Sequence, residues 1–113
     1  MNMARPRLEN RVDYIEFPGK NLAATKKFYK KVFAWRFTDY GEDYTSFADG
    51  RLTGGFTSHL PPKRGGALVV IYSSKIESIL KKVVVAGGKI VKPIFPFPGG
   101  RRFHFIDPSA NEL

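Results

Sequence analysis

Cysteine is absent from the 113 residues, and so are long hydrophobic runs. Without cysteine the chain has no disulfide, no thiolate nucleophile and no cysteine-ligated zinc. No segment approaches the roughly 18 consecutive apolar residues of a membrane helix, and the N-terminal stretch lacks the apolar core of an export signal. We therefore expect a cytoplasmic protein that folds without covalent cross-links.

Acidic residues are scarce beside basic ones, with 10 Asp and Glu against 19 Lys and Arg and a net charge of +9. This balance suits nucleic acid or anionic ligands, but charge by itself describes solubility and non-specific association. Apolar material is plentiful: 42% of residues are hydrophobic, and there are ten Phe and five Tyr. A chain of this size buries roughly two thirds of its unfolded surface, which predicts one folded domain.

Two stretches have the apolar periodicity of helices. In Leu22–Phe33 apolar residues recur at helical spacing, and Asn21 is the predicted N-cap. From Ile76 to Val84 the pattern is i, i+3, i+4, i+7, i+8, and a Gly-Gly pair at 87–88 supplies the stop. The arc opposite the first apolar stripe carries Lys26, Lys27, Lys30 and Lys31. These lysines predict a solvated face, with anion binding as the alternative.

The chain repeats itself when it is shifted so that Leu22 falls on Ile76. A predicted strand precedes each helix, and shorter β-rich runs follow it. In the first half the strands are Val12–Phe17, Trp35–Tyr40, Tyr44–Ala48 and Leu52–Thr57. In the second half they are Ala67–Tyr72, Lys89–Lys92, Arg101–Ile106 and a run from Asn111. Each half therefore reads strand, helix, strand, strand, strand.

Turn and breaker residues in LPPKRGG separate the halves. We predict an N-terminal tail at 1–10 and a single domain at 11–113. The domain consists of module one at 11–59, a linker at 60–66 and module two at 67–113.

From Arg11 to Leu113 the chain resembles the vicinal oxygen chelate superfamily of glyoxalase I, bleomycin-resistance proteins and extradiol dioxygenases. The resemblance rests on DYIEF, on NLAATKKFYKKVFAW with its Phe28-Tyr29 pair, on GGKIV and on FIDPSANEL. It implies an α+β fold in which two tandem βαβββ modules form a curled, barrel-like mixed sheet around a cavity. It also implies a homodimer, and either metal-dependent chemistry or metal-free binding of a compound.

In metal-dependent members the resemblance implies His, Glu or Gln ligands on the first and last strands of each module. Here those positions fall on Tyr14, on Leu68 and near Phe56, and none is a good ligand for a divalent ion. The fourth position would lie past Leu113. We therefore expect no evident cofactor and leave a divalent metal open, together with a lyase or isomerase activity related to lactoylglutathione lyase.

Two residues are candidates for catalysis. Glu16 lies two residues after Tyr14, so both share a strand face, and Glu16 is a candidate general base or lone ligand. In RRFHFID, His104 shares a face with Arg102 and Ile106, and it is a candidate proton shuttle or metal ligand. The structural alternatives are a surface or salt-bridged glutamate and a core histidine.

The candidate ligand-binding residues are strand side chains that could line the cavity, namely Tyr14, Tyr44, Phe56, Leu68, Tyr72 and Arg102. The aromatic ones could equally fill the core. Arg101 and Arg102 could clamp an anionic group. The segment PIFPFPGG, 93–100, reads as a loop or a sheet edge whose phenylalanines could cover a cavity mouth or a partner.

The leading hypothesis is a small-molecule-binding protein with no membrane partner. One alternative is a single-stranded nucleic-acid-binding module, because GGRRFHFI places aromatics beside basic residues on a strand. Against it, most lysines belong to the helices. A second alternative is a non-catalytic protein that sequesters a ligand and thereby confers resistance.

Ala34 and Ala110 occupy positions where sequences of this kind commonly have glycine. A positive φ there would strain each alanine by roughly 1 kcal/mol.

Overall fold

The computed structural model describes residues 9–10, 12–61 and 67–113. Most of the predicted tail and of the predicted linker lies outside these described residues. In chain order the elements are β1 (Tyr14–Pro18), α1 (Leu22–Phe33), β2 (Arg36–Asp39), β3 (Tyr44–Ala48), β4 (Thr53–Thr57), α2 (Ile76–Val85), β5 (Lys89–Phe97) and β6 (Gly100–Ile106). Neither helix is long and apolar enough to cross a membrane.

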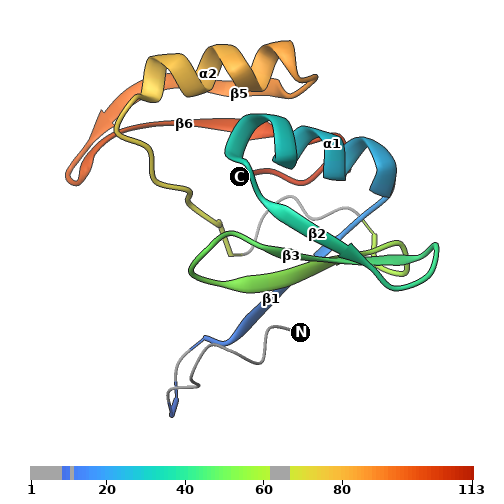
Figure 1. Ribbon diagram of the computed structural model, residues 1–113. Helices are drawn as coiled ribbons and strands as arrows, with labels where there is room; N and C mark the ends of the chain where they lie inside the picture. Colours follow the sequence, from blue (N-terminus) through green and yellow to red (C-terminus); the bar gives the residue numbers. More distant parts are fainter. Residues whose placement is uncertain (1–8, 11, 62–66) are drawn as a thin grey trace.

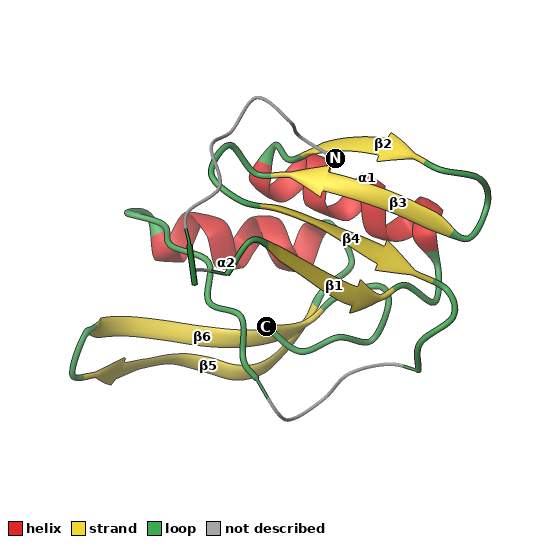
Figure 2. Ribbon diagram, turned by 90° about the horizontal axis from the view of Figure 1, so that it is seen from below, coloured by secondary structure: helices red, strands yellow, loops and turns green. Residues whose placement is uncertain are grey.

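The strands form a curled sheet that is not closed. Its described strands fall into two separately hydrogen-bonded groups: four strands in the order β1-β4-β3-β2, and the pair β5-β6. The first strand pairs with β4 in parallel, with Tyr14 opposite Thr53, whereas the other pairs are antiparallel. Both helices lie over the strands in Figure 1, and in Figure 2 the strands lie in front of them. This arrangement confirms the predicted fold class and leaves one face of the sheet free of helices.

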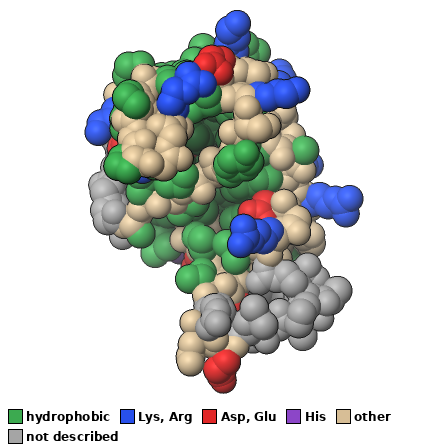
Figure 3. All heavy atoms as spheres, turned by 90° about the vertical axis from the view of Figure 1, so that its left-hand side faces the viewer, with side chains coloured by type: hydrophobic (Ala, Val, Ile, Leu, Met, Phe, Trp, Pro, Cys, Tyr) green, Lys and Arg blue, Asp and Glu red, His purple; other side chains and the backbone are tan. Residues whose placement is uncertain are grey.

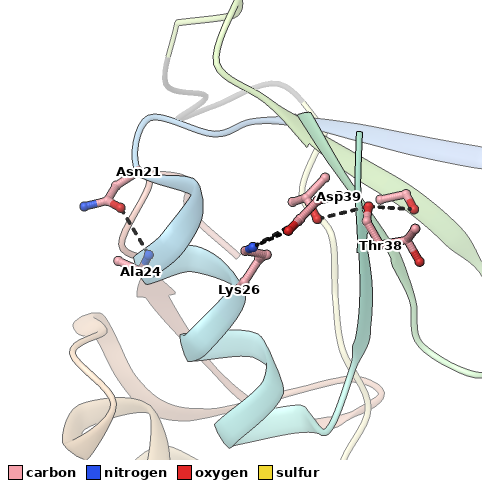
Figure 4. A network of polar contacts seen from close by, with 7 residues as sticks. Asn21, Ala24, Lys26, Thr38 and Asp39 are labelled. Carbon is pink, nitrogen blue, oxygen red and sulfur yellow. Dashed lines mark hydrogen bonds and ion pairs between the residues drawn. The ribbon is translucent and has the colours of Figure 1, made fainter. Parts of the chain in front are cut away.

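Helix α1 begins and ends with local interactions that the sequence indicated. The Asn21 side chain accepts a hydrogen bond from the backbone N–H of Ala24 at 3.1 Å (Figure 4), which satisfies one of the free donors of the first turn. Ala34 closes the helix with φ 61°, and Ala110 has φ 65° in the last turn of the chain. The sequence raised a positive φ at these two positions as a condition, and the structure shows it at both, so two alanines hold conformations that favour glycine.

The lysines of α1 point away from the core, as predicted. Lys27, Lys30 and Lys31 are exposed. Lys26 is half-buried and donates to both carboxylate oxygens of Asp39 at 2.9 Å, so this ion pair ties α1 to β2 (Figure 4). The basic face of the helix is therefore a solvated surface with one local ion pair.

Aromatic rings fill the space between α1 and the sheet. Tyr29 has 0% exposure, and its ring centroid lies 4.5 Å from that of Trp35. The Trp35 ring stacks in turn on Phe47, again at 4.5 Å. The other buried hydrophobic residues of the core are Phe17, Phe28, Val32, Phe56, Val83, Phe105 and Leu113.

The prediction of a regular strand at Ala67–Tyr72 is wrong. Burial alternates along this segment as in a strand, and Val69 and Ile71 pack against the core. The segment nevertheless belongs to no β-ladder of the described residues. In module one, β1 takes its hydrogen bonds from β4. In module two, the counterpart of β4 is the run that begins at Asn111. Among the described residues, this run pairs with β6 through one bridge, between Ile106 and Glu112. The segment therefore has the strand pattern without a strand partner.

The interpretation of 93–100 as a loop is corrected, whereas its interpretation as a sheet edge holds. Strand β5 continues through Pro93 and Pro96 to Phe97. Its register against β6 shifts twice, between Ile90 and Lys92 and between Lys92 and Phe95. In the described sheet β5 has one neighbour, so a proline without an N–H can occupy its outer side.

A buried polar network around Asp107 joins the two halves. Its Oδ1 accepts from the backbone N–H groups of Ser109 and Asn111 at 2.8 and 2.9 Å. Its Oδ2 accepts from the Tyr29 hydroxyl at 2.9 Å, and the Asn111 amide donates to the Pro18 carbonyl at 2.7 Å. Burial raises the pKa of Asp107, and these hydrogen bonds act in the opposite direction. The last turn of the chain is thereby fastened to β1 and α1.

We expect Asn111→Ala to lower the free energy of unfolding by about 1–3 kcal/mol, because it leaves the buried Pro18 carbonyl without its donor. Chemical denaturation measures the loss. Ser58→Ala is the matched control, because the Ser58 hydroxyl bonds to Asp43 at an exposed site and its removal should cost less than about 0.5 kcal/mol. Equal losses in the two variants would show that the network does not join the halves.

Candidate functional site

The alternation of side chains along β1 decides which residues reach the helix-free face. Phe17 belongs to the core and Ile15 packs against it, so Tyr14 and Glu16 project from the opposite face. On β3 the buried Phe47 similarly places Tyr44 on the helix-free side. The sequence predicted that Tyr14 and Glu16 share a face, and the fold brings Tyr44 to them.

Tyr14 and Tyr44 meet through their hydroxyl groups at 2.5 Å. Gly55 of β4 makes this contact possible, because a Cβ there would overlap the Tyr44 hydroxyl and lie 2.8 Å from that of Tyr14. Burial raises the pKa of the Tyr44 phenol, as do the hydrogen bond with Tyr14 and the neighbouring Glu16 carboxylate. The Tyr44 ring therefore serves as a neutral hydroxyl group beside Tyr14 and the Glu16 carboxylate.

This cluster does not fit the divalent metal of the metal-dependent relatives. A phenol whose pKa is raised is a poor ligand, and among the described residues Glu16 is the carboxylate beside the two hydroxyls. Across the described part of the chain, no three His, Cys, Asp or Glu side chains come together in a way that could hold an ion.

A second polar cluster lies on β6. Arg101 projects to the helix side and forms an ion pair with Glu77 of α2 at 2.7 Å. The alternate residues Arg102 and His104 project to the helix-free side. The sequence predicted that they share a face, and the structure decides which face it is. The arginines are neighbours in sequence, but they face opposite sides of the sheet.

Two phenylalanine rings support the Arg102 guanidinium. Its central carbon lies 4.9 Å from the ring centroid of Phe97 and 5.5 Å from that of Phe95. Both rings come from β5, in the stretch predicted to cover a cavity mouth. The Nε of Arg102 is buried and has no hydrogen-bond partner in the described structure.

His104 is 7% exposed and forms one polar contact, from Nδ1 to the Glu112 carboxylate at 3.3 Å. The Glu112 carboxylate can accept a hydrogen bond from Nδ1–H of His104. Nε2 has no partner among the described residues. An unpaired buried nitrogen of this kind costs about 1–3 kcal/mol unless a ligand or solvent pairs with it.

A cleft of about 390 Å³ adjoins this cluster. Its walls are the strand-like segment 68–74, with Leu68 and Tyr72, and the stretch 99–105, with Arg101, Arg102 and His104. Helix α2 contributes Ile76 and Ile79. Figure 3 shows a hollow on this side of the molecule with hydrophobic side chains around it. The volume falls within the range of about 300–1,000 Å³ that is typical of small-molecule sites.

A broader hollow of about 900 Å³ lies along the same segment, where Val69–Tyr72 face the end of β1. Its floor is formed by core aromatics such as Trp35 and Phe47. The segment therefore covers the core incompletely on this side.

The structure divides the predicted site residues into two sets and leaves one residue outside both. Tyr14, Glu16 and Tyr44 form the first cluster, while Leu68, Tyr72, Arg102 and His104 line the 390 Å³ cleft. Phe56 joins neither set, because it is fully buried against α1 and stacks on Phe17 with ring centroids 5.1 Å apart.

Sequence reasoning missed Gly55 and Glu112. Gly55 shows its role only when β3 and β4 are placed in register, Ser46 opposite Gly55. A signal for Glu112 existed, because a turn after β6 brings the run from Asn111 back beside His104.

With this geometry established, comparison with known proteins gives a family. The profile of the Glyoxalase/Bleomycin resistance protein/Dioxygenase superfamily matches residues 11–113, so the chain belongs to that superfamily. A search of curated proteins found no match.

Several solved structures share the fold. A family enzyme from Burkholderia phytofirmans PsJN is 16% identical with a TM-score of 0.74, and the alignment covers 89% of this chain and 94% of that one. The fosfomycin resistance protein FosX from Listeria monocytogenes is 17% identical with a TM-score of 0.72, covering 93% and 90%. TioX from Micromonospora sp. ML1 is 16% identical with a TM-score of 0.68, covering 91% and 94%. At these identities the likeness shows the fold alone.

We expect Gly55→Ala to lower the free energy of unfolding by about 1–3 kcal/mol, because the new Cβ must displace the Tyr44 hydroxyl. The same substitution made in a Tyr44→Ala background should cost clearly less, since the group it displaces is gone. A double-mutant cycle by chemical denaturation measures the coupling. Additive losses would mean that Gly55 does not hold this pair of tyrosines in place.

Proposed function

We propose that this chain binds a small organic molecule in the cleft between the segment 68–74 and β6. The observation that supports this function is the position of Arg102 and His104 on β6, in a cleft whose opposite wall is formed by the segment 68–74. Leu68 and Tyr72 supply apolar contact, and Arg102 and His104 supply polar contact. Such a combination is the usual composition of a small-molecule site.

Binding is favoured here over the lyase or isomerase chemistry of metal-dependent relatives. The tyrosine cluster provides neutral hydroxyls where those relatives would need metal ligands. The contact between His104 and Glu112 is the arrangement in this site that most resembles a catalytic acid–base pair. Membership of the fold does not by itself assign catalysis to that pair. Sequestration of a compound, as in a resistance protein, therefore suits this site better than turnover does.

The nucleic-acid alternative loses its main support. A stacking platform needs aromatic rings that are free to receive bases. On β6, Phe105 is buried and Phe103 packs against the core, while Phe95 and Phe97 of β5 hold Arg102. No free row of aromatics remains on the described part of this hairpin.

We expect small aromatic compounds to shift the amide resonances of residues 68–74 and 100–105 in two-dimensional NMR. Tyr72→Ala should weaken the binding about two- to tenfold, because an aromatic contact contributes about 0.5–1.5 kcal/mol. Stability should be unchanged, since the side chain is 87% exposed. Val85→Ala, at a 75% exposed position on α2, is the control. Shifts confined to other parts of the molecule would contradict the proposed site.

We also propose that two copies associate. Val70 is 62% exposed on the strand-like segment 67–72, whereas its neighbours Val69 and Ile71 pack against the core. Exposed apolar side chains favour contact with another chain, and a second copy is the occupant consistent with the homodimers that the resemblance implies.

Sedimentation equilibrium should therefore report a dimer, and Val70→Lys should shift it toward monomer by placing a charge in the contact. Val84→Lys, at an exposed position on α2, should leave the dimer intact. A wild-type chain that is monomeric at every concentration would rule out this association.

A further inference from the structure

We propose that the outer face of the two helices binds the phosphate backbone of double-stranded DNA. The surface in question, called the basic helix face below, consists of five exposed lysines of α1 and α2, namely Lys27, Lys30, Lys31, Lys81 and Lys82. None of these lysines lines the cleft, so the proposal is independent of the proposed function. It gives a role to the lysine pairs of α1, which the proposed function leaves without one.

The charge of the basic helix face is not balanced by acidic side chains. Helix α1 contains four lysines and no acidic residue. The acid of α2 is Glu77, which is paired with Arg101 at 2.7 Å. Asp39 of β2 is likewise paired with Lys26. Within the described part of the chain, none of the five lysines forms an ion pair, so their charge is available to a partner.

Like charges lie close together along α1. Lys27 and Lys31 are four residues apart, which places them one turn apart on the same side of the helix, and Lys30 lies beside them. Charges of one sign at this spacing repel each other and lower the stability of a helix. The helix dipole accounts for lysines in the last turn, such as Lys30 and Lys31, but Lys27 and Lys81 precede that turn. An anionic partner with closely spaced charges would relieve the repulsion.

The two helices lie side by side with their C-terminal halves adjacent. In Figure 1 α1 runs from right to left and α2 from left to right, and Figure 2 shows both behind the strands. Just after α2, a Cβ on Gly88 would lie 3.1 Å from the Phe28 ring of α1. Because Phe28, Val32 and Val83 are buried, the opposite side of each helix faces outward. The lysines of both helices therefore belong to one surface.

A phosphate backbone suits this surface better than a lipid bilayer or another protein does. The apolar side of α1 packs into the core through Phe28, Tyr29 and Val32, so this helix has no apolar face to insert into a bilayer. At the end of α2, Val84 and Val85 are exposed, but these side chains are shorter than the Trp, Phe or Leu of membrane-inserting helices. Protein interfaces have apolar centres that are depleted in lysine. Phosphates, in contrast, attract lysine as a point charge.

The double-stranded form of DNA follows from the side chains of α1. Single strands bind by stacking their bases on free aromatic rings, and the aromatic residues of α1 are buried or half-buried. RNA duplexes are recognised partly through their 2′-hydroxyls. The exposed positions along α1 hold Ala23 and three lysines, which bring no acceptor for these hydroxyls. Phosphate contacts carry no sequence information, so the binding should be independent of DNA sequence.

The test titrates a fluorescein-labelled DNA duplex of about 20 base pairs with the full chain, and fluorescence anisotropy measures the affinity between about 50 and 200 mM KCl. Duplexes of unrelated sequence should bind equally. With up to five phosphate contacts, log K should fall with log salt with a slope of about −4, which is a loss of roughly a hundredfold or more over this range.

Lys27→Gln combined with Lys31→Gln should weaken the binding at least about tenfold at low salt and make the slope less negative by about 2, one for each lost contact. The matched control is Lys89→Gln combined with Lys92→Gln. It removes the same charge from exposed lysines of β5 whose ladder partners on β6 face the helix-free side. The control should keep the slope and stay within about threefold of the original affinity. Amide spectra establish that both variants are folded.

The remaining outcomes overturn the proposal. Equal losses in the two double variants would mean that the DNA responds to net charge, and an absence of binding at low salt would mean that the face has no such partner. Tighter binding of the single strand or of an RNA duplex of the same sequence would indicate base stacking or 2′-hydroxyl contacts instead. Binding to vesicles of phosphatidylcholine and phosphatidylserine but not to DNA would make the partner a lipid surface. The cleft is tested separately, by the NMR titration with aromatic compounds.

Discussion

The buried carboxylate of Asp107 is the constraint on which the arrangement of the two halves depends. It accepts hydrogen bonds from the turn that follows β6 and from Tyr29 of α1, and Asn111 beside it binds the carbonyl at the end of β1. Burial raises the pKa of this carboxyl, and each donor offsets part of the cost. Because the donors come from both modules, the carboxylate is satisfied only when the modules are correctly docked.

That docking positions the helix-free face. Tyr29 extends the Asp107 network directly into the aromatic stack with Trp35 and Phe47, so the polar clamp and the core stabilise the same orientation of α1. Both helices pack on one face of the sheet. Because side chains alternate along a strand, every second residue of each strand therefore projects from the opposite face. The two polar clusters are consequences of this division.

Local features were predictable, since their causes are local. The bounds of α1, the Asn21 cap and the positive φ of Ala34 and Ala110 follow from side chains and backbone within one turn. The face shared by Arg102 and His104 follows from strand alternation. Pairing was not predictable in this way: Ala67–Tyr72 has the strand pattern but no ladder, because a ladder needs a partner elsewhere in the chain. Phe56 was assigned to the cavity, yet its place in the sheet directs it into the core.

The sequence by itself determined the class of fold, the repeated modules, most element boundaries and the side chains available for chemistry. These depend on hydrophobic periodicity, capping and turn residues, which act over a few positions. Only the tertiary structure decided that Arg101 is neutralised by Glu77 while Arg102 is not, that Glu112 returns to His104, and that Gly55 leaves room for two tyrosines. Each of these joins residues from different elements, and their distances exist only after the sheet has curled.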